Sequence, residues 1–171
     1  MDPADHYIGL VKLGHDAFVT SAAPAALVRT RPDGGSGHTD DVTRESSVDL
    51  ERQTFVAAPD GQHGPRRLEI YPLAKKPHAP FPDMITIGRT PNNDVVLKDA
   101  TVSRLHAFFR HRDGHWQIAD GGSKNGTYLD GTVLAPRKER DVASGQRIKI
   151  GDLELVFYTS EELFKMLTLV T

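Results

Sequence analysis

Cysteine is absent from this 171-residue sequence. Its absence excludes disulfides, thiolate catalysis and cysteine-based zinc sites, and it fits a reducing compartment. No apolar run approaches the roughly 20 residues that a membrane helix needs. The acidic start, Met-Asp-Pro-Ala-Asp, lacks the basic residues and apolar core of a signal peptide. These absences predict a cytoplasmic protein without membrane contact.

A strong charge of either sign is also absent, since the net charge is −2. Residues 1–64 carry 10 acidic and 5 basic side chains, a net of −5. Residues 65–171 carry 13 acidic and 16 basic side chains, a net of +3. A mildly basic C-terminal part suits a small anionic ligand or an acidic peptide. It falls short of the basic bias typical of a nucleic-acid domain.

The N-terminal third shows weak structural signals. Residues 1–30 predict a short helical and extended segment, with a helix after Gly14 that ends at Pro24 and an extended piece at 26–28. Residues 31–65 are rich in Gly, Pro, Ser and Asp, which predicts a flexible linker, with a short strand at 54–56 as an alternative.

From residue 66 the pattern changes to short alternating strands. Three pairs of runs are separated by hairpin signals: Asp113-Gly114, Asp130-Gly131 and Gly151-Asp152. Many short strands with frequent turns predict an all-β sandwich or barrel over residues 66–159. Thr159 and Glu162 have the spacing of a capping box, so we expect a helix over 160–171 that packs on the β domain.

Three polar clusters stand at the ends of the predicted strands. The first is Gly88-Arg89, the second runs from Ser103 to His106, and the third runs from Asp120 to Thr127. Hydrogen-bond donors and positive charge gathered in loops suit an anion, and phosphate is the obvious candidate.

For the residues of these clusters, a purely structural role is the alternative to anion binding. Arg89 can hold a phosphate with two parallel hydrogen bonds, but it can also pair with a carboxylate such as Asp94. Ser103 can donate to a phosphate oxygen and Arg104 adds a second cation. For His106 we favour a buried structural histidine that holds loop backbone.

The Asn125-Gly126 pair is typical of a tight turn. Asn125 also carries a donor and an acceptor, so it can bracket the backbone of an extended peptide. Gly126 permits the sharp turn, and we expect Thr127 to close a local hydrogen bond.

Taken together, Gly-Arg, Ser-x-x-His and Asn-Gly in this order and strand context resemble the forkhead-associated (FHA) domain over about residues 66–158. The resemblance implies an FHA/SMAD-like two-sheet antiparallel β-sandwich of about eleven strands, here with a short C-terminal helix and a partly ordered N-terminal extension. It also implies loops at one end that bind phosphothreonine peptides.

The same resemblance implies a role for each matching residue. Arg89, Ser103, Arg104 and Lys124 fall on positions that line the phosphate pocket, and Asn125 on the position that grips the peptide backbone. Supporting roles fall on Gly88 and His106, and we expect Gly126 and Thr127 to support the site through the turn and the local hydrogen bond described above. Lys124 stands where Thr or Ser is frequent, so its charge is expected to alter affinity or selectivity.

The sequence therefore predicts a non-enzymatic, phosphothreonine-dependent adaptor in kinase-linked signalling, with no cofactor and no metal. Its expected partner is a phosphothreonine protein, with a Ser/Thr kinase or a kinase substrate as candidates. The alternatives are a phosphate-independent scaffold that works through the N-terminal extension and, more remotely, a weak nucleic-acid binder. Partner, sequence preference and oligomeric state stay open.

Three further hypotheses rest on single residue sets. A hydrolase triad of Ser103, His106 and Asp120 is disfavoured because the serine does not stand in Gly-x-Ser-x-Gly. A metal site from His106, His111 and His115 is disfavoured because the spacing crosses a hairpin. Phosphorylated linker Thr43, docking into an FHA site in cis or in trans, is the third.

Overall fold

The computed structural model describes residues 2–32, 53–56, 66–77, 79 and 81–171. Its strands form a seven-stranded sheet in the order β2-β3-β1-β12-β11-β8-β9 and a five-stranded sheet in the order β10-β7-β6-β4-β5. The first sheet consists of β1 (Ala25–Pro32), β2 (Gln53–Val56), β3 (Arg66–Pro72), β8 (Thr127–Leu129), β9 (Thr132–Val133), β11 (Arg147–Ile150) and β12 (Leu153–Thr159). The second consists of β4 (Ile85–Gly88), β5 (Val95–Val96), β6 (Ala107–Arg112), β7 (His115–Asp120) and β10 (Arg140–Val142).

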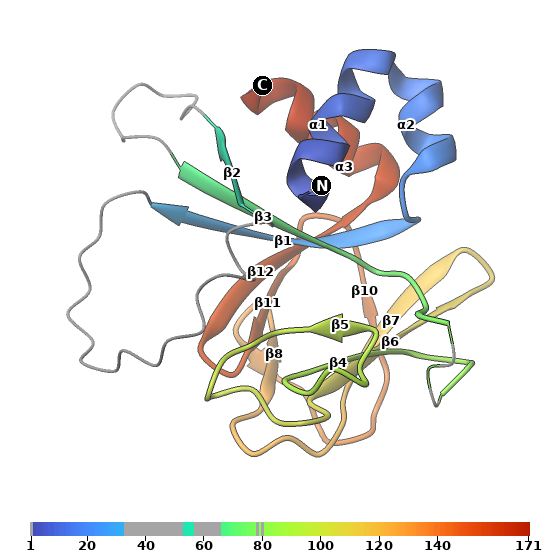
Figure 1. The fold of residues 1–171 in the computed structure, drawn as a ribbon. Helices are drawn as coiled ribbons and strands as arrows, with labels where there is room; N and C mark the ends of the chain where they lie inside the picture. Colours follow the sequence, from blue (N-terminus) through green and yellow to red (C-terminus); the bar gives the residue numbers. More distant parts are fainter. Residues whose placement is uncertain (1, 33–52, 57–65, 78, 80) are drawn as a thin grey trace.

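The two sheets pack face to face, which confirms the predicted sandwich (Figure 1). Their shared core includes Leu27, Phe109, Ile118 and Phe157, all fully buried. The pairing is antiparallel except between β4 and β5, which are parallel. Among the strand pairs of the described residues, the predicted antiparallel arrangement therefore holds for all but this one.

Three helices cover the other face of the seven-stranded sheet (Figure 1): α1 (Pro3–Leu13), α2 (His15–Ser21) and α3 (Ser160–Val170). A second core lies beneath them, where Phe18 and Leu163 meet Val28 and Ile70. The predicted C-terminal helix is confirmed, and Thr159 is its N-cap residue. Its hydroxyl makes no capping hydrogen bond and instead lies 3.2 Å from the Ser144 hydroxyl.

The N-terminal region contributes more to the fold than the sequence predicted. β1 lies in the seven-stranded sheet between β3 and β12. A domain boundary at residue 66 therefore leaves out a strand with a neighbour on each side. Ala25, Ala26, Leu27 and Val28 are all buried, because one face meets the other sheet and the opposite face meets the helices. The sequence of such a strand is a continuous apolar run and lacks the alternation of apolar and polar residues seen in strands with one exposed face.

Within the predicted linker, residues 53–56 form β2, so the short strand given as an alternative at 54–56 is present. Thr43 and the rest of the linker, residues 33–52 and 57–65, lie outside the described residues.

The three predicted hairpins are present, with β6–β7, β8–β9 and β11–β12 as their strand pairs. Asp113 and Gly114 both have positive φ, as do Asp130 and Gly131. This conformation matches the right-handed twist of the paired strands and explains the Asp-Gly signals.

Candidate functional site

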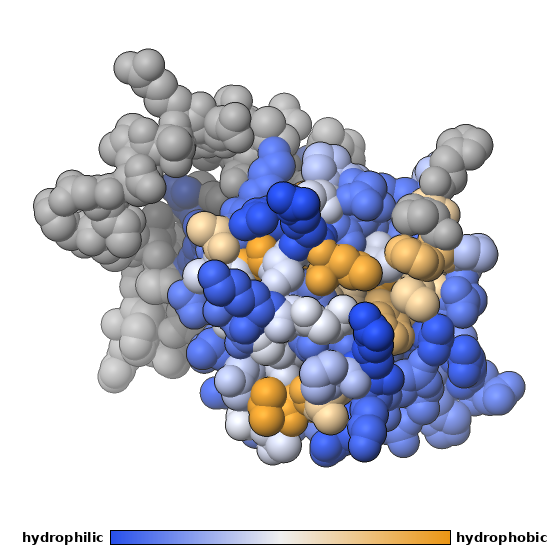
Figure 2. All heavy atoms as spheres, turned by 90° about the horizontal axis from the view of Figure 1, so that it is seen from below, coloured by the Kyte–Doolittle hydropathy of each residue, from blue (hydrophilic) through white to orange (hydrophobic). Residues whose placement is uncertain are grey.

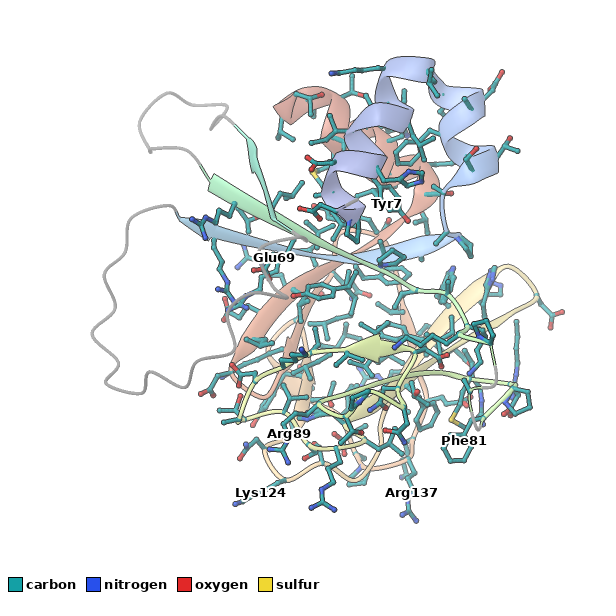
Figure 3. All side chains as sticks on the ribbon, in the orientation of Figure 1. Tyr7, Glu69, Phe81, Arg89, Lys124 and Arg137 are labelled. Carbon is teal, nitrogen blue, oxygen red and sulfur yellow. The ribbon has the colours of Figure 1, made fainter. Side chains whose placement is uncertain are left out.

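Three loops meet at one end of the sandwich: 89–94 after β4, 97–106 before β6, and 121–126 before β8. Figure 3 shows Arg89 and Lys124 at this end, below the strands that carry their loops. Direct hydrogen bonds join the loops, from the Arg89 N–H to the Ser103 carbonyl at 3.0 Å and from the Lys124 N–H to Ser103 Oγ at 3.0 Å. The three clusters of the sequence are therefore neighbours in space.

Arg89 follows β4 with its side chain exposed. The alternative pairing with Asp94 is wrong, because Asp94 Oδ2 lies 2.7 Å from Lys75 Nζ. Asp94 also accepts the N–H groups of Lys76 and Thr86. Within the described parts of the chain, the Arg89 guanidinium makes no ion pair.

The buried Asp94 carboxylate serves the scaffold of this loop. Burial alone would raise the pKa of Asp94, but the hydrogen bonds from Lys75, Lys76 and Thr86 together lower the pKa below its usual value. The residue is thus a charged anchor that joins the segment before β4 to β5, and it leaves Arg89 available to a ligand.

Gly88 stands where two loops approach each other closely. A Cβ atom at this position would lie 2.0 Å from the Arg104 carbonyl oxygen and 2.7 Å from Asn93 Nδ2. Buried Asn93 donates from Nδ2 to that same carbonyl at 2.6 Å, and Thr90 Oγ1 donates to it at 3.1 Å. Only glycine fits here, which agrees with the supporting role expected for Gly88. Asn93 was not among the predicted residues.

Ser103 and Arg104 present polar groups from the second loop. Ser103 Oγ accepts the Lys124 N–H, so its own hydroxyl proton is left to donate to an anion. Arg104 has an exposed side chain, whereas its carbonyl is held by Asn93 and Thr90. The backbone is therefore fixed while the guanidinium extends into solvent.

His106 is fully buried and joins two of the loops. Its Nδ1 accepts the Ser103 N–H at 3.0 Å, and its Nε2 donates to the Gly126 carbonyl at 2.9 Å. This assignment requires the neutral imidazole with the proton on Nε2. Burial lowers the pKa of His106 more than the Gly126 carbonyl and Asp120 raise it. These contacts support the structural histidine favoured from the sequence.

Asp120 organises the third loop. Its Oδ2 accepts the N–H groups of Gly122 and Ser123, and its Oδ1 accepts the hydroxyls of Ser123 and Thr127. Burial alone would raise the pKa of Asp120, but these hydrogen bonds lower it. Thr127 is fully buried and makes the local hydrogen bond that we expected of it.

From the sequence, Asp120 was expected only as the first residue of the third polar cluster and as a disfavoured triad member, so this organising role was missed. A signal was present, since Asp followed by Gly-Gly-Ser is a typical Asx-turn sequence in which the carboxylate accepts N–H groups two and three residues ahead. Ser123 extends the network, because its Oγ accepts the Gly126 N–H. Gly126 has a φ of 84°, a conformation that glycine adopts without strain.

Lys124 and Asn125 are exposed at the tip of this loop. The Asn125 amide nitrogen donates to the Thr101 carbonyl at 2.8 Å, which leaves its Oδ1 and its second N–H available. Lys124 Nζ has no carboxylate within ion-pair distance among the residues described.

The hydrolase triad is ruled out by these contacts. Both imidazole nitrogens of His106 are bonded to backbone groups, so neither can take the Ser103 hydroxyl proton. Asp120 is bonded within its own loop. No cluster of three metal-binding side chains occurs in the described residues, where His111 instead stacks on Trp116 with ring centroids 4.4 Å apart.

The end of the molecule that carries these loops is mainly hydrophilic, with hydrophobic side chains in separate places (Figure 2). Arg89, Arg104 and Lys124 contribute one cation from each loop. With the Ser103 hydroxyl and the Asn125 amide beside them, this set can bind a compact dianion next to a hydrogen-bonding backbone. None of the described helices could span a membrane.

A family model described as the FHA domain matches residues 85–151. The chain is 46% identical over 72 residues to the oxoglutarate dehydrogenase inhibitor of Corynebacterium diphtheriae, covering 42% of this chain and 48% of that protein. It is 44% identical over 72 residues to the glycogen accumulation regulator GarA of Mycolicibacterium smegmatis, covering 42% of this chain and 44% of that protein. The chain thus spans about half the length of the curated relatives it matches.

Among solved structures, the chain is similar to EmbR of Mycobacterium tuberculosis in complex with a low-affinity phosphopeptide. The identity is 32%, the match covers 45% of this chain and 20% of that chain, and the TM-score is 0.42.

Proposed function

Because this chain carries an FHA domain, we propose that it is a phosphothreonine-dependent peptide-binding adaptor in kinase-linked signalling, which acts by binding and not by catalysis. The observation that carries the proposal is the set of three cations, Arg89, Arg104 and Lys124, that face outward from three loops without ion pairs among the described residues. A phosphate dianion is the partner that such a set lacks.

In this proposal the phosphate takes a bidentate contact from Arg89 and a hydrogen bond from the Ser103 hydroxyl. Arg104 and Lys124 add charge from either side. The loops need little rearrangement, because buried His106 and Asp120 hold them before the ligand arrives. A preformed site loses less entropy on binding.

Asn125 provides the second half of recognition. Its free Oδ1 and N–H can bond one peptide group on a chain that runs past the loop tip. Preference for threonine over serine is an expectation of the family resemblance.

The partner is proposed to be a phosphothreonine protein, with a Ser/Thr kinase or its substrate as candidates. The curated relatives are named as an inhibitor of oxoglutarate dehydrogenase and a regulator of glycogen accumulation. Those names support a regulatory role for this chain, exerted through binding to an enzyme or its kinase. The cytoplasmic location stays a prediction from the sequence.

The test begins with a screen of an oriented phosphothreonine peptide library against the chain, and calorimetry on the best peptide. We expect a dissociation constant of about micromolar, and binding too weak to measure for the unphosphorylated peptide. Arg89→Ala should cost about 1.5–3 kcal/mol for each charged hydrogen bond lost. Arg89→Lys should recover only part of that loss, because lysine cannot form the bidentate contact.

Arg112→Ala is the matched control. Arg112 is exposed at the end of β6, in the β6–β7 hairpin, so this variant removes the same charge outside the three loops and should bind as the wild type does. Equal binding of phosphorylated and unphosphorylated peptides would sink the proposed function.

A further inference from the structure

Thr101, two residues before Ser103, joins three segments of the chain. Its N–H and its hydroxyl both donate to Asp99 Oδ1, at 2.8 Å and 2.5 Å. Its hydroxyl oxygen accepts the Asp152 N–H at 2.8 Å, and its carbonyl accepts the Asn125 amide at 2.8 Å. Every polar group of Thr101 is therefore engaged, and no part of it faces the proposed phosphate site unbonded.

The backbone around Thr101 leaves its carbonyl little freedom. A Cβ atom on Gly151 would lie 2.6 Å from the Thr101 carbonyl oxygen, so the β11–β12 turn packs closely against this peptide group. Buried Val102 fixes the chain on the other side. The carbonyl is thus a fixed acceptor aimed at Asn125.

A fixed acceptor determines how the Asn125 carboxamide is turned. Only the nitrogen end can face a carbonyl, so Oδ1 must lie at the opposite edge of the amide plane. Without that contact the exposed side chain would rotate among several rotamers, and ordering it would weaken peptide binding.

We propose that Asp99 and Thr101 are positioning residues for peptide recognition: Asp99 holds Thr101, and the Thr101 carbonyl orients the Asn125 amide toward the peptide backbone. This inference rests on the proposed function and deepens it. It divides the site into a phosphate half at Arg89 and Ser103 and a backbone half that depends on Asp99.

The direction in which phosphopeptide affinity changes when Asp99 is replaced distinguishes a positioning role from a purely electrostatic one. Removal of the Asp99 carboxylate takes a negative charge away from a site that binds an anion, so charge alone would tighten phosphopeptide binding. Positioning requires the opposite result, a loss of affinity.

The experiment measures affinity for the library-selected phosphothreonine peptide by calorimetry. We expect Asp99→Ala to weaken binding by about 3- to 10-fold. Asp99→Asn removes the same charge but keeps an acceptor oxygen, and it should bind more tightly than Asp99→Ala. Thr101→Val should weaken binding, whereas Thr101→Ser, which keeps the hydroxyl, should restore most of it.

A double-mutant cycle with Asn125→Ala tests whether the affinity loss in Asp99→Ala is transmitted through Asn125. If Asp99 acts through Asn125, Asp99→Ala should cause no further loss of affinity in the Asn125→Ala background. Inorganic phosphate, titrated against the chain by NMR, should bind Asp99→Ala at least as tightly as it binds the wild type, because the phosphate does not use Asn125 and the variant has lost a negative charge.

The proposal is overturned by additive losses in the cycle, by unchanged or tighter peptide binding in Asp99→Ala, or by an equal loss of inorganic phosphate binding. A variant that has lost its cooperative unfolding transition is replaced in the cycle by Thr101→Val. A wild type that does not distinguish phosphorylated from unphosphorylated peptide refutes the proposed function instead, so the two failures are separable.

Discussion

At the scale of single residues, the end of the sandwich that carries the three loops depends on buried side chains, such as His106, that bond the loop backbone. His106 joins the Ser103 loop to the Gly126 loop only while its imidazole is neutral, because Nδ1 must accept a hydrogen bond. Protonation would turn that acceptor into a donor facing the Ser103 N–H. The loop geometry at this site should therefore be lost at a pH low enough to protonate the buried His106.

This dependence on pH gives a prediction with a definite sign. Burial lowers the pKa of His106 below its ordinary value of 6.5, so the unfolded chain binds this proton more readily than the folded chain. The stability tied to neutral His106 is present above about pH 6.5 and is lost as pH falls toward the folded pKa. Chemical denaturation should show a larger loss of unfolding free energy in the wild type than in His106→Gln between about pH 7.5 and pH 5.

Equal losses in wild type and variant would contradict this prediction. The lowered pKa values of Asp94 and Asp120 act in another window, because carboxylate contributions are lost only below about 3.8. Asp94 and Asp120 therefore do not contribute to the difference between wild type and His106→Gln above pH 5.

Two glycines form a matched pair for a second prediction. Gly88→Ala places a methyl group 2.0 Å from the Arg104 carbonyl, so it should destabilise the fold by about 1–3 kcal/mol or more and weaken phosphopeptide binding. Gly9 lies within α1, where a methyl group would meet nothing within 4 Å beyond the adjacent backbone of the helix itself, so Gly9→Ala should stabilise by about 0.5–1 kcal/mol. Denaturant unfolding measures both, and equal effects would refute the assigned role of Gly88.

The sequence indicated these site residues because their types are tied to local loop chemistry. Glycine at a close approach, Asn-Gly at a turn and Ser-x-x-His at a strand entry are readable over a few positions. The contact of Asn93 with Arg104 and those of Thr101 with Asn125 and Asp152 were not readable, since they join residues 11 to 51 positions apart. Those pairings depend on the tertiary fold.

At the scale of elements, β1 and α1 are two whose place in the fold was not predicted from the sequence. β1 is buried on both faces along its first half, so its pattern lacks the alternation of the later strands. α1 did carry signals, with Asp2 as N-cap, Pro3 at the first position and Tyr7 and Leu10 on one face. The helix predicted within residues 1–30 began only after Gly14, so α1 itself was missed. The hairpins were predictable because each turn is encoded by two adjacent residues.

The position of β1 predicts the outcome of a truncation. A chain that begins at residue 66 lacks β1 and β2, so β12 keeps only its ladder with β11 and β3 loses both of its partners. Buried residues such as Ile70 and Phe157 become exposed. We expect this fragment to show no cooperative thermal transition and no phosphopeptide binding. Circular dichroism and calorimetry against the full chain provide the check; a fragment with full affinity would make the N-terminal region dispensable.

At the scale of the whole molecule, the helices cover the seven-stranded sheet, and the loops proposed to bind phosphopeptide lie at an end of the sandwich (Figure 1). The charge is divided as well, with the excess of acidic residues before residue 65 and the excess of basic residues after it. A net of +3 over residues 65–171 gives little long-range attraction for a polyanion. Recognition must then depend on the few contacts at the loop end.

Salt dependence tests this difference between a local site and a basic surface. A nucleic-acid binder that contacts 6–10 phosphates loses about 10³–10⁵ in affinity between 50 and 200 mM salt. One phosphothreonine held by Arg89, Ser103, Arg104 and Lys124 exchanges far fewer counterions, so its affinity should fall less than about 10-fold over that range. Calorimetry at both salt concentrations measures the slope, with a mixed-sequence DNA duplex as comparison. A slope for the phosphopeptide as steep as that of a multi-phosphate binder would favour the nucleic-acid alternative.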